Sequence, residues 1–251
     1  KSESKIVQVG AKTTPMPTLG AWAGIAGQAN VRRTPSAYKL ILTVIWLWRR
    51  KMQDKTPDEV LKEEQAILGT EQGNIFNVLK NNIFWLEIKW KEYQTLYENN
   101  ANIAVLNKTA PFYFYMIQQI MIDDILLHIS KIASQKGITY KYLSIIRLPE
   151  IVKPKYRDKL KELVDDAVAK AEFVKDRRNR YIAHYSLDLT IDPQARPLED
   201  IKHEDIENVI KAFKKIIFYI YTQVLDSALF PEVLYPLENA NALLRRLKQT
   251  I

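Results

Sequence analysis

Apolar side chains recur every three or four residues along most of the chain, which is the spacing of one face of an α-helix. Over residues 75–97 the apolar positions step by 4, 4, 3, 4, 3 and 4 residues. Residues 114–132 and 206–225 show the same spacing. Each of these three stripes predicts a long helix, and no stretch alternates in the way that would indicate a β-strand of consequence.

Capping residues and prolines set the predicted helix boundaries. Thr56-Pro57-Asp58-Glu59 combines a Thr cap, a Pro in the first helical position and a Glu three residues after the cap. Pro111 marks another start, a further long helix is expected from near Pro154 to about Tyr185, and a last helix ends in residues 245–248. Several long helices joined by short linkers predict an all-α fold, an antiparallel helical bundle.

The first part of the chain has a different character. Residues 1–36 hold four of the seven Gly and three of the eleven Pro, with little periodicity, which predicts an irregular segment. Residues 1–56 contain ten Lys/Arg and two acidic residues, whereas residues 57–251 contain 27 Lys/Arg and 27 Asp/Glu. We therefore expect a basic N-terminal extension over 1–56. The helical bundle domain over 57–251 is neutral, so its affinity for nucleic acid depends on local basic clusters.

Composition removes several kinds of chemistry. The absence of Cys excludes disulfides, cysteine-based zinc sites, iron–sulfur clusters and thiol catalysis. Three His disfavour a His-rich metal site, so neither a metal nor a cofactor is expected. The longest apolar run, Leu40–Trp48, has nine residues, against about 20 for a membrane-spanning helix. It predicts a short amphipathic or buried helix, with membrane contact through Trp46, Trp48 and the basic residues 49–51 as the alternative. With no export signal, a cytoplasmic protein is expected.

The helix expected from Pro154 has a charged residue where its pattern predicts an apolar one. Its apolar stripe, extended by steps of three and four, reaches Arg178, Tyr181 and Tyr185. A charge on a core-facing stripe is costly unless it has a partner or faces a cleft or an interface. His184 lies about 120° around an ideal helix from Arg178, so a groove shared by two subunits would gather the two groups more easily. The alternative is a solvated face of arginines, with His184 favoured by the helix dipole.

The string RNRYIAHYSLD, which begins at Arg178, resembles the signature of the HEPN superfamily. That signature is an Arg, usually followed by a polar residue, and a His after four to six intervening residues. Here Asn179 follows Arg178, and five residues separate Arg178 from His184. The Arg-Asn…Ile-Ala-His form is most similar to the branch associated with bacterial abortive-infection systems. Residues 1–56 lie outside what the resemblance explains.

The resemblance implies a metal-independent endoribonuclease that works as a homodimer, with a composite site made by two facing motifs. His184 would act as general base or acid toward the ribose 2′-OH or the leaving 5′-oxygen. Arg178 would bind the scissile phosphate, and Asn179 would orient one of them or hydrogen-bond the phosphate. The products would be a 2′,3′-cyclic phosphate and a 5′-hydroxyl. The expected setting is phage defence or a toxin–antitoxin system, with an antitoxin or another protein as a partner.

The residues around the motif are candidates for RNA binding. Lys175, Arg177 and Arg180 would steer RNA through unspecific phosphate contacts. Tyr181 and Tyr185 are candidates for stacking on bases, although packing on the helix stripe is the interpretation we favour for both.

The competing hypothesis is a non-catalytic HEPN-like interaction or scaffold module that binds a protein or nucleic-acid partner. The presence of both Arg178 and His184 favours the enzyme, whereas the neutral bundle favours the module.

The other two histidines, His128 and His203, are weaker candidates for a functional role. Asp124 and His128 are expected to form a hydrogen bond within one helix, with a supporting pair near the cleft as the alternative, and His203 is expected at the surface.

Overall fold

The structure is a computed structural model of the chain, in which the described residues are 56–134, 142–182, 186–187, 191–192, 194–227 and 238–250. The chain divides between residues 60 and 61, and nearly all described residues belong to the unit that follows this division. Most of the expected extension over residues 1–56, including Leu40–Trp48, lies outside the described residues. The irregular character of that extension therefore stays a prediction.

The first described helix, α3 (Pro57–Leu68), begins at the predicted capping sequence. The amide of Thr56 donates to Glu59 Oε2 at 2.7 Å, and the amide of Glu59 donates to Thr56 Oγ1 at 3.3 Å. This reciprocal pair satisfies two amide donors that a bare helix end would leave open. Gly69, at φ 98°, then separates α3 from the next helix, and only Gly adopts that backbone conformation readily.

Three helices form the first half of the bundle: α4 (Thr70–Tyr97), α5 (Asn100–Thr109) and α6 (Pro111–Ile132). The helix α4 ends at Tyr97, shortly before a group of asparagines. One of them, Asn99, starts α5, because its side chain caps that helix by accepting a hydrogen bond from the Ala101 amide at 2.8 Å. Pro111 occupies the first turn of α6, as predicted.

The second half contains two helices of 17 residues and several shorter elements. In chain order these are η2 (Ile145–Arg147), α7 (Leu148–Ile151), α8 (Pro154–Lys170), α9 (Phe173–Arg177), the π-helix η3 (Arg178–Ile182), α11 (His203–Tyr219), the π-helix η4 (Ile220–Val224) and α12 (Ala240–Thr250). The expected single helix from Pro154 to Tyr185 is wrong, because a turn at Ala171–Glu172 interrupts it. Across this turn the backbone bonds join residues three apart, as in Val174 to Ala171 and Lys175 to Glu172, which breaks the α-helical register.

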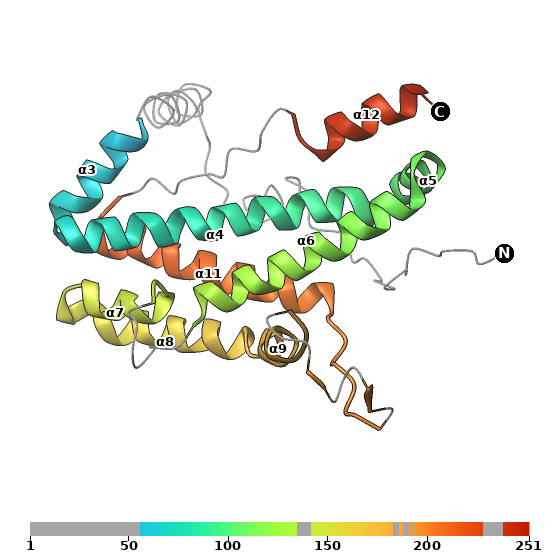
Figure 1. Cartoon of the computed structure of the whole chain (residues 1–251). Coiled ribbons are helices and arrows are strands. Elements are labelled where there is room, and N and C mark those ends of the chain that lie inside the picture. Colours follow the sequence, from blue (N-terminus) through green and yellow to red (C-terminus); the bar gives the residue numbers. More distant parts are fainter. Residues whose placement is uncertain are drawn as a thin grey trace, which may run out of the picture. The chain divides into compact units, whose positions relative to one another are not determined.

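The predicted apolar stripes form the core. On α4 the inward residues Leu79, Ile83, Leu86, Trp90, Tyr93 and Tyr97 are all buried. Full burial of one such aliphatic side chain contributes roughly 2 kcal/mol, so each stripe is a large part of the folding free energy. The helix α4 packs against α6 and α11, and α11 packs against α8 (Figure 1). The described residues contain helices and no strand, so the all-α prediction is confirmed, and none of these helices combines the length and apolarity needed to cross a membrane.

A buried polar cluster joins α3, α4 and η4 inside this core. Glu64 and Lys80 form an ion pair, and the Tyr221 hydroxyl donates to Glu64 Oε1 at 2.5 Å. Asn77 Nδ2 donates to the other oxygen, Glu64 Oε2, at 2.9 Å. Burial lowers the pKa of Lys80, and the neighbouring Glu64 carboxylate opposes that shift. The cluster therefore fixes where the end of α11 meets the first two helices.

Candidate functional site

The motif segment is carried by α9 and η3, which both pack against α6. The predicted stripe is correct up to Val174, because Leu160, Ala167, Ala171 and Val174 are buried. Arg178, the next position of the stripe, is exposed. The extension of the core-facing stripe to Arg178 is therefore wrong, and whether Arg178 faces a cleft or an interface stays a prediction. The turn before α9 and the wider turn of a π-helix change the angle at which each residue projects.

Arg178 and Asn179 both lie exposed at the beginning of η3. Among the described residues, neither side chain has a hydrogen-bond or ion-pair partner. A guanidinium in that position offers all of its N–H donors to an incoming anion.

The other cations of the segment are already paired with acids. Lys175 Nζ lies 2.8 Å from Glu172 Oε1, and Arg180 Nη1 lies 3.1 Å from Asp176 Oδ2. Arg177 Nε lies 3.8 Å from Asp123 Oδ1. The three predicted RNA-steering residues therefore each have an acidic partner within the chain, and Arg178 differs from all of them.

Arg177 attaches the motif segment to α6. Its guanidinium carbon lies 5.2 Å from the centre of the Tyr181 ring, and Asp123 belongs to α6. Burial raises the pKa of Asp123, while the positive charge of Arg177 acts in the opposite direction. Tyr181 is 37 % exposed and does not belong to the buried core, so the favoured expectation that it packs on the core stripe is wrong. Arg177 instead lies over the ring as a cation on an aromatic face.

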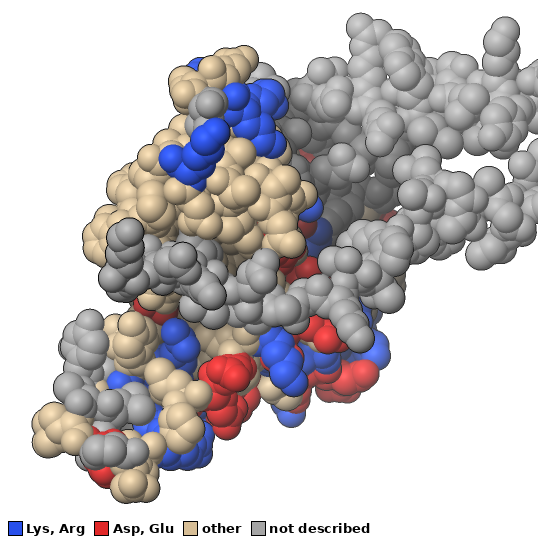
Figure 2. All heavy atoms as spheres, turned by 90° about the vertical axis from the view of Figure 1, so that its right-hand side faces the viewer, with Lys and Arg blue, Asp and Glu red and all other residues tan. Residues whose placement is uncertain are grey.

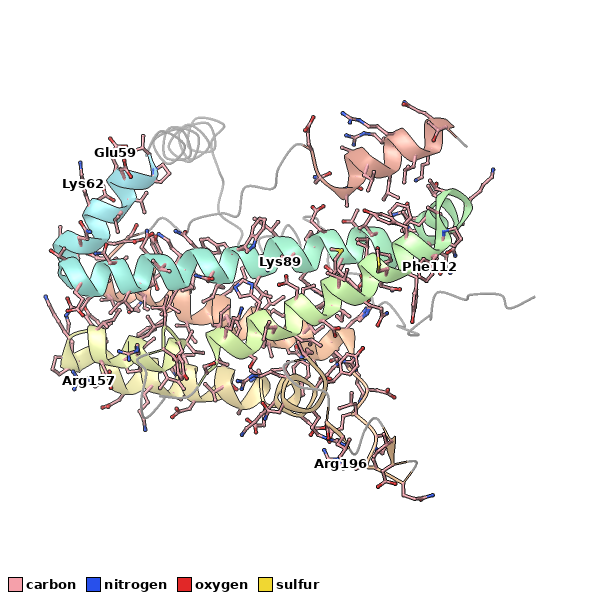
Figure 3. The ribbon with its side chains drawn as sticks, in the orientation of Figure 1. Glu59, Lys62, Lys89, Phe112, Arg157 and Arg196 are labelled. Atoms are coloured by element: carbon pink, nitrogen blue, oxygen red, sulfur yellow. The ribbon has the colours of Figure 1, made fainter. Side chains whose placement is uncertain are left out.

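Arg180 attaches the same segment to the chain that follows it. Arg180 Nη2 donates to the Arg196 carbonyl oxygen at 2.6 Å, and Arg196 Nη2 lies 3.5 Å from Asp176 Oδ2 (Arg196 is labelled in Figure 3). Asp176 of α9 thus accepts a hydrogen bond from Arg180 and forms an ion pair with Arg196, and these contacts hold residues around 196 against α9 and η3. Sequence analysis missed Arg196, since nothing local indicates that it returns to this point.

His184 and Tyr185 lie outside the described residues. Their predicted roles, as proton carrier and as a base-stacking or packing residue, stay predictions.

The two other histidines differ from expectation. His128 is 8 % exposed and its Nε2 lies 3.2 Å from Asn82 Oδ1 on α4, while Asp124 pairs with Lys89 at 2.6 Å. The expected Asp124–His128 hydrogen bond is therefore wrong, because both side chains turn toward α4. Burial lowers the pKa of His128 to about 4, and the Lys89 charge adds to that effect.

His203 was expected at the surface, and that expectation is also wrong. Its Nδ1 lies 2.9 Å from Glu98 Oε1, and its ring meets Trp90 and Tyr93 edge-on with centroid distances of 5.2 and 5.7 Å. The acidic residues beside it in the sequence suggested a surface position, whereas its partners are Trp90 and Tyr93 of α4 and Glu98 directly after that helix.

A family model supplies the deciding comparison. The HEPN_AbiU2 model, described as AbiU2, matches residues 70–242, which is more than half of the chain. The chain belongs to this HEPN-type abortive-infection family. The AbiU2-type match contains α9 and η3, and with them the motif from Arg178 to His184. Residues 1–69 lie outside the AbiU2-type match. Searches of curated proteins and of solved structures found no match.

No group of acids and histidines that could hold a metal ion occurs in the part of the chain that the structure describes.

Proposed function

We propose that this HEPN-type protein is a metal-independent endoribonuclease that uses Arg178, Asn179 and His184. One observation carries the proposal. Arg178 is exposed and has no side-chain partner among the described residues, whereas Lys175, Arg177 and Arg180 around it are each paired with an acid. A cation left open at the family motif suits a phosphate, which accepts two parallel hydrogen bonds from one guanidinium.

The reaction follows from these groups. The ribose 2′-oxygen attacks the adjacent phosphorus while a His184 imidazole takes the 2′-OH proton. The bond from phosphorus to the 5′-oxygen breaks, and the second His184 of a dimer donates a proton to that oxygen. Arg178 stabilises the charge that builds up on the phosphoryl oxygens, and Asn179 donates a hydrogen bond to the same group. The products are a 2′,3′-cyclic phosphate and a 5′-hydroxyl.

The second copy has a candidate contact surface on α6. Phe112, Met116 and Ile120 lie four residues apart, form one ridge of that helix and are exposed, Phe112 by 73 %. Figure 3 labels Phe112 at the start of α6, and Figure 2 looks onto that end, where a wide area carries no charged side chain. Ile120 is three residues before Asp123, which pairs with Arg177, so a copy seated on this ridge would lie beside the motif segment. That continuity supports a homodimer as the unit that cleaves RNA.

The competing function is a non-catalytic module within an abortive-infection or toxin–antitoxin system, held by a protein partner. The balance of charge favours it. Residues 57–251 carry as many acidic as basic residues, and the lower part of the face in Figure 2 shows the two signs intermixed. RNA affinity therefore requires local cation clusters, such as the one around Arg178.

Cleavage of RNA in the presence of a chelator separates the two functions. Wild type should produce fragments that end in 2′,3′-cyclic phosphate. Arg178→Ala and His184→Ala should each lower the rate by at least about 100-fold, the usual effect of removing a charge-stabilising or proton-transferring group. Arg246→Ala, which removes an exposed arginine of α12, is the matched control and should leave the rate unchanged. Equal rates for all four proteins would remove the assigned site.

A further inference from the structure

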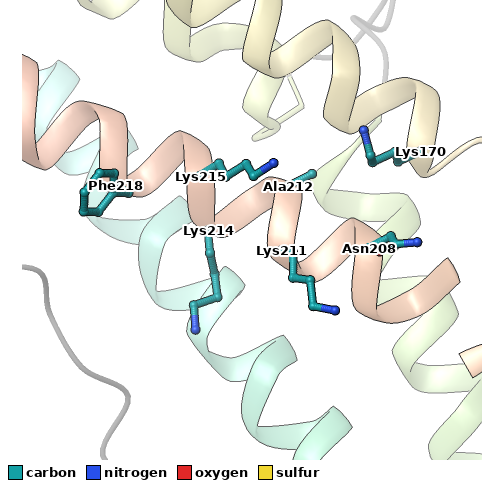
Figure 4. Close-up of a pocket in the computed structure, with 7 residues that line it drawn as sticks. All are labelled: Lys170, Asn208, Lys211, Ala212, Lys214, Lys215 and Phe218. Atoms are coloured by element: carbon teal, nitrogen blue, oxygen red, sulfur yellow. The ribbon is translucent and has the colours of Figure 1, made fainter. Parts of the chain in front are cut away.

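A groove lies between the C-terminal end of α8 and the outer side of α11, and it has a volume of about 470 Å³. Lysines make up much of its lining: Lys170 from α8 and Lys211, Lys214 and Lys215 from α11. Figure 4 shows Lys170 on α8 and Lys215 on α11. Along α11, Asn208 lies at one end of the lining and Phe218 at the other.

The groove follows one face of α11. Asn208, Lys211, Lys215 and Phe218 are spaced by three, four and three residues, so they form one stripe along the helix. At 1.5 Å per residue this stripe is about 15 Å long. Phe218 is 54 % exposed, although the isoleucines of the same helix are buried on its other side. An aromatic side chain that is more than half exposed therefore lies at the end of a basic stripe.

The lysines differ in how firmly they are engaged. Among the described residues Lys215 has no partner. Lys211 and Lys170 form pairs with Glu207 and Asp166 one helical turn away, and exposed pairs of this kind contribute little stability. Both can therefore exchange a carboxylate for another anion. Lys214 reaches α4, where it pairs with Glu87 at 2.7 Å, so we treat it as a structural contact.

We propose that Lys170, Lys211 and Lys215 bind the phosphates of single-stranded RNA, with Phe218 stacking on a base. Lysine is a mobile point charge that suits phosphates without base selection, and aromatic stacking accepts any base. An acidic peptide would use the same lysines but has no base to stack on the exposed ring, so the aromatic residue favours RNA.

The position of the groove connects it with the motif. Its α9 end contains Lys170 and Asn208, and α9 with η3 follows α8 directly (Figure 1). The inference rests on the proposed function, because it adds a binding track to a site that cleaves RNA. A substrate held at Arg178 would continue over Lys170 and along α11 toward Phe218.

Binding is tested apart from cleavage, in full-length protein carrying His184→Ala. Fluorescence anisotropy with a labelled 16-nucleotide single-stranded RNA gives the dissociation constant at several salt concentrations. Adding Lys211→Gln and Lys215→Gln should weaken binding at least five-fold and lower the slope of log affinity against log salt by roughly 1.4, the value for two lost phosphate contacts. Adding Phe218→Ala should weaken binding without changing that slope.

The matched control adds Lys159→Gln and Lys161→Gln, two exposed lysines of α8 that also pair with acids one turn away. It removes the same charge and should leave both affinity and slope near the parent values. A second readout is photocrosslinking of 4-thiouridine RNA, which should label the peptide that begins after Lys215 and contains Phe218.

Equal affinities for the groove and control variants would overturn the proposal, as would a crosslink map without that peptide. Binding of a polyglutamate peptide that depends on Lys211 and Lys215, without such dependence for RNA, would assign the groove to an acidic protein and also overturn it. If Arg178→Ala cleaved RNA as fast as wild type, the proposed function would be contradicted. The binding measurements would still decide whether the groove binds RNA.

Discussion

Two adjacent arginines in the motif segment have different surroundings and so different expected roles. Arg177 is half-buried between Asp123 and the Tyr181 ring, whereas Arg178 is exposed and, among the described residues, has no partner. One holds the segment against α6, and the other remains open to a ligand.

Substitution of each arginine by Ala should separate stability from activity. Arg177→Ala should lower the free energy of unfolding by about 1–2 kcal/mol, because it leaves Asp123 half-buried without its counter-charge. Arg178→Ala should change that energy by less than about 0.5 kcal/mol, as for most exposed residues. Urea unfolding followed by circular dichroism measures both, and an equal loss in the two variants would contradict the assignment.

His128 predicts a pH dependence of stability. Its pKa is lowered to about 4 in the folded protein, against 6.5 for an ordinary imidazole, so the unfolded chain binds a proton that the folded chain does not. The stabilisation is complete above pH 6.5 and is lost as the pH falls toward 4, by up to about 3 kcal/mol. The charges facing the ring are Lys89 on α4 and Asp124 and Lys131 on α6.

Unfolding free energies of wild type and of His128→Gln at pH 7.5, 6 and 5 test this dependence. The variant should lose less stability on acidification than wild type does. His203→Gln removes a different imidazole and is the control. The same pH slope for both variants would mean that His128 is not held neutral by burial.

At the scale of elements, the buried Glu64–Lys80–Tyr221 cluster decides how the end of α11 attaches to α3 and α4. Lys80→Met should lower stability by about 3 kcal/mol or more, because it leaves the Glu64 carboxylate buried without a counter-ion. Adding Glu64→Gln should recover a large part of that loss. Lys159→Met removes a lysine of an exposed pair and should have little effect in the same urea titration. Equal losses for Lys80→Met and Lys159→Met would contradict the role of the cluster.

The long helices were predictable because burial imposes a regular pattern on them. The stripes on α4, α6 and α11 follow the three-to-four spacing closely, and Thr56 and Pro111 mark helix starts by chemistry that depends only on neighbours in the sequence. The turn at Ala171–Glu172 was not predictable, since neither residue disfavours a helix. That turn and the wide turn of η3 invalidate any extension of the stripe to Arg178.

The candidate site was predictable in composition more than in geometry. The spacing of Arg178 and His184 identified the family. However, the partner of Arg177 is Asp123, and Arg180 contacts Arg196 in addition to its neighbour Asp176, so two of these three partners are distant in the sequence. The sequence did mark Asp123 as unusual, because it is an acidic residue in an otherwise apolar helix. His203 was misjudged because its partners, Trp90 on α4 and Glu98 directly after that helix, are more than a hundred residues away in the sequence.

For the whole molecule, the exposed ridge of α6 predicts self-association. Met116→Lys combined with Ile120→Lys should convert a dimer into a monomer at micromolar concentration, because two charges would be placed in an apolar contact. RNA cleavage should fall with it, since each site would lose its second His184. Sedimentation velocity and a cleavage assay measure the two effects.

The control for that experiment is Val78→Lys, which places a charge on an exposed apolar position of α4. It should leave both association and cleavage unchanged. A wild-type protein that sediments as a monomer and still cleaves RNA would exclude the composite site.

The two π-helical turns, η3 and η4, have a consequence for how chain length can vary between relatives. Each turn closes its backbone bonds over five residues where an α-helix closes them over four, so it holds one residue that an ordinary turn would not need. Deletion of that residue restores an α-turn locally and leaves the preceding helix in place. Natural one-residue gaps in an alignment should therefore gather at 178–182 and 220–224, and a gap in the first range would rotate Arg178, on which the proposed chemistry depends.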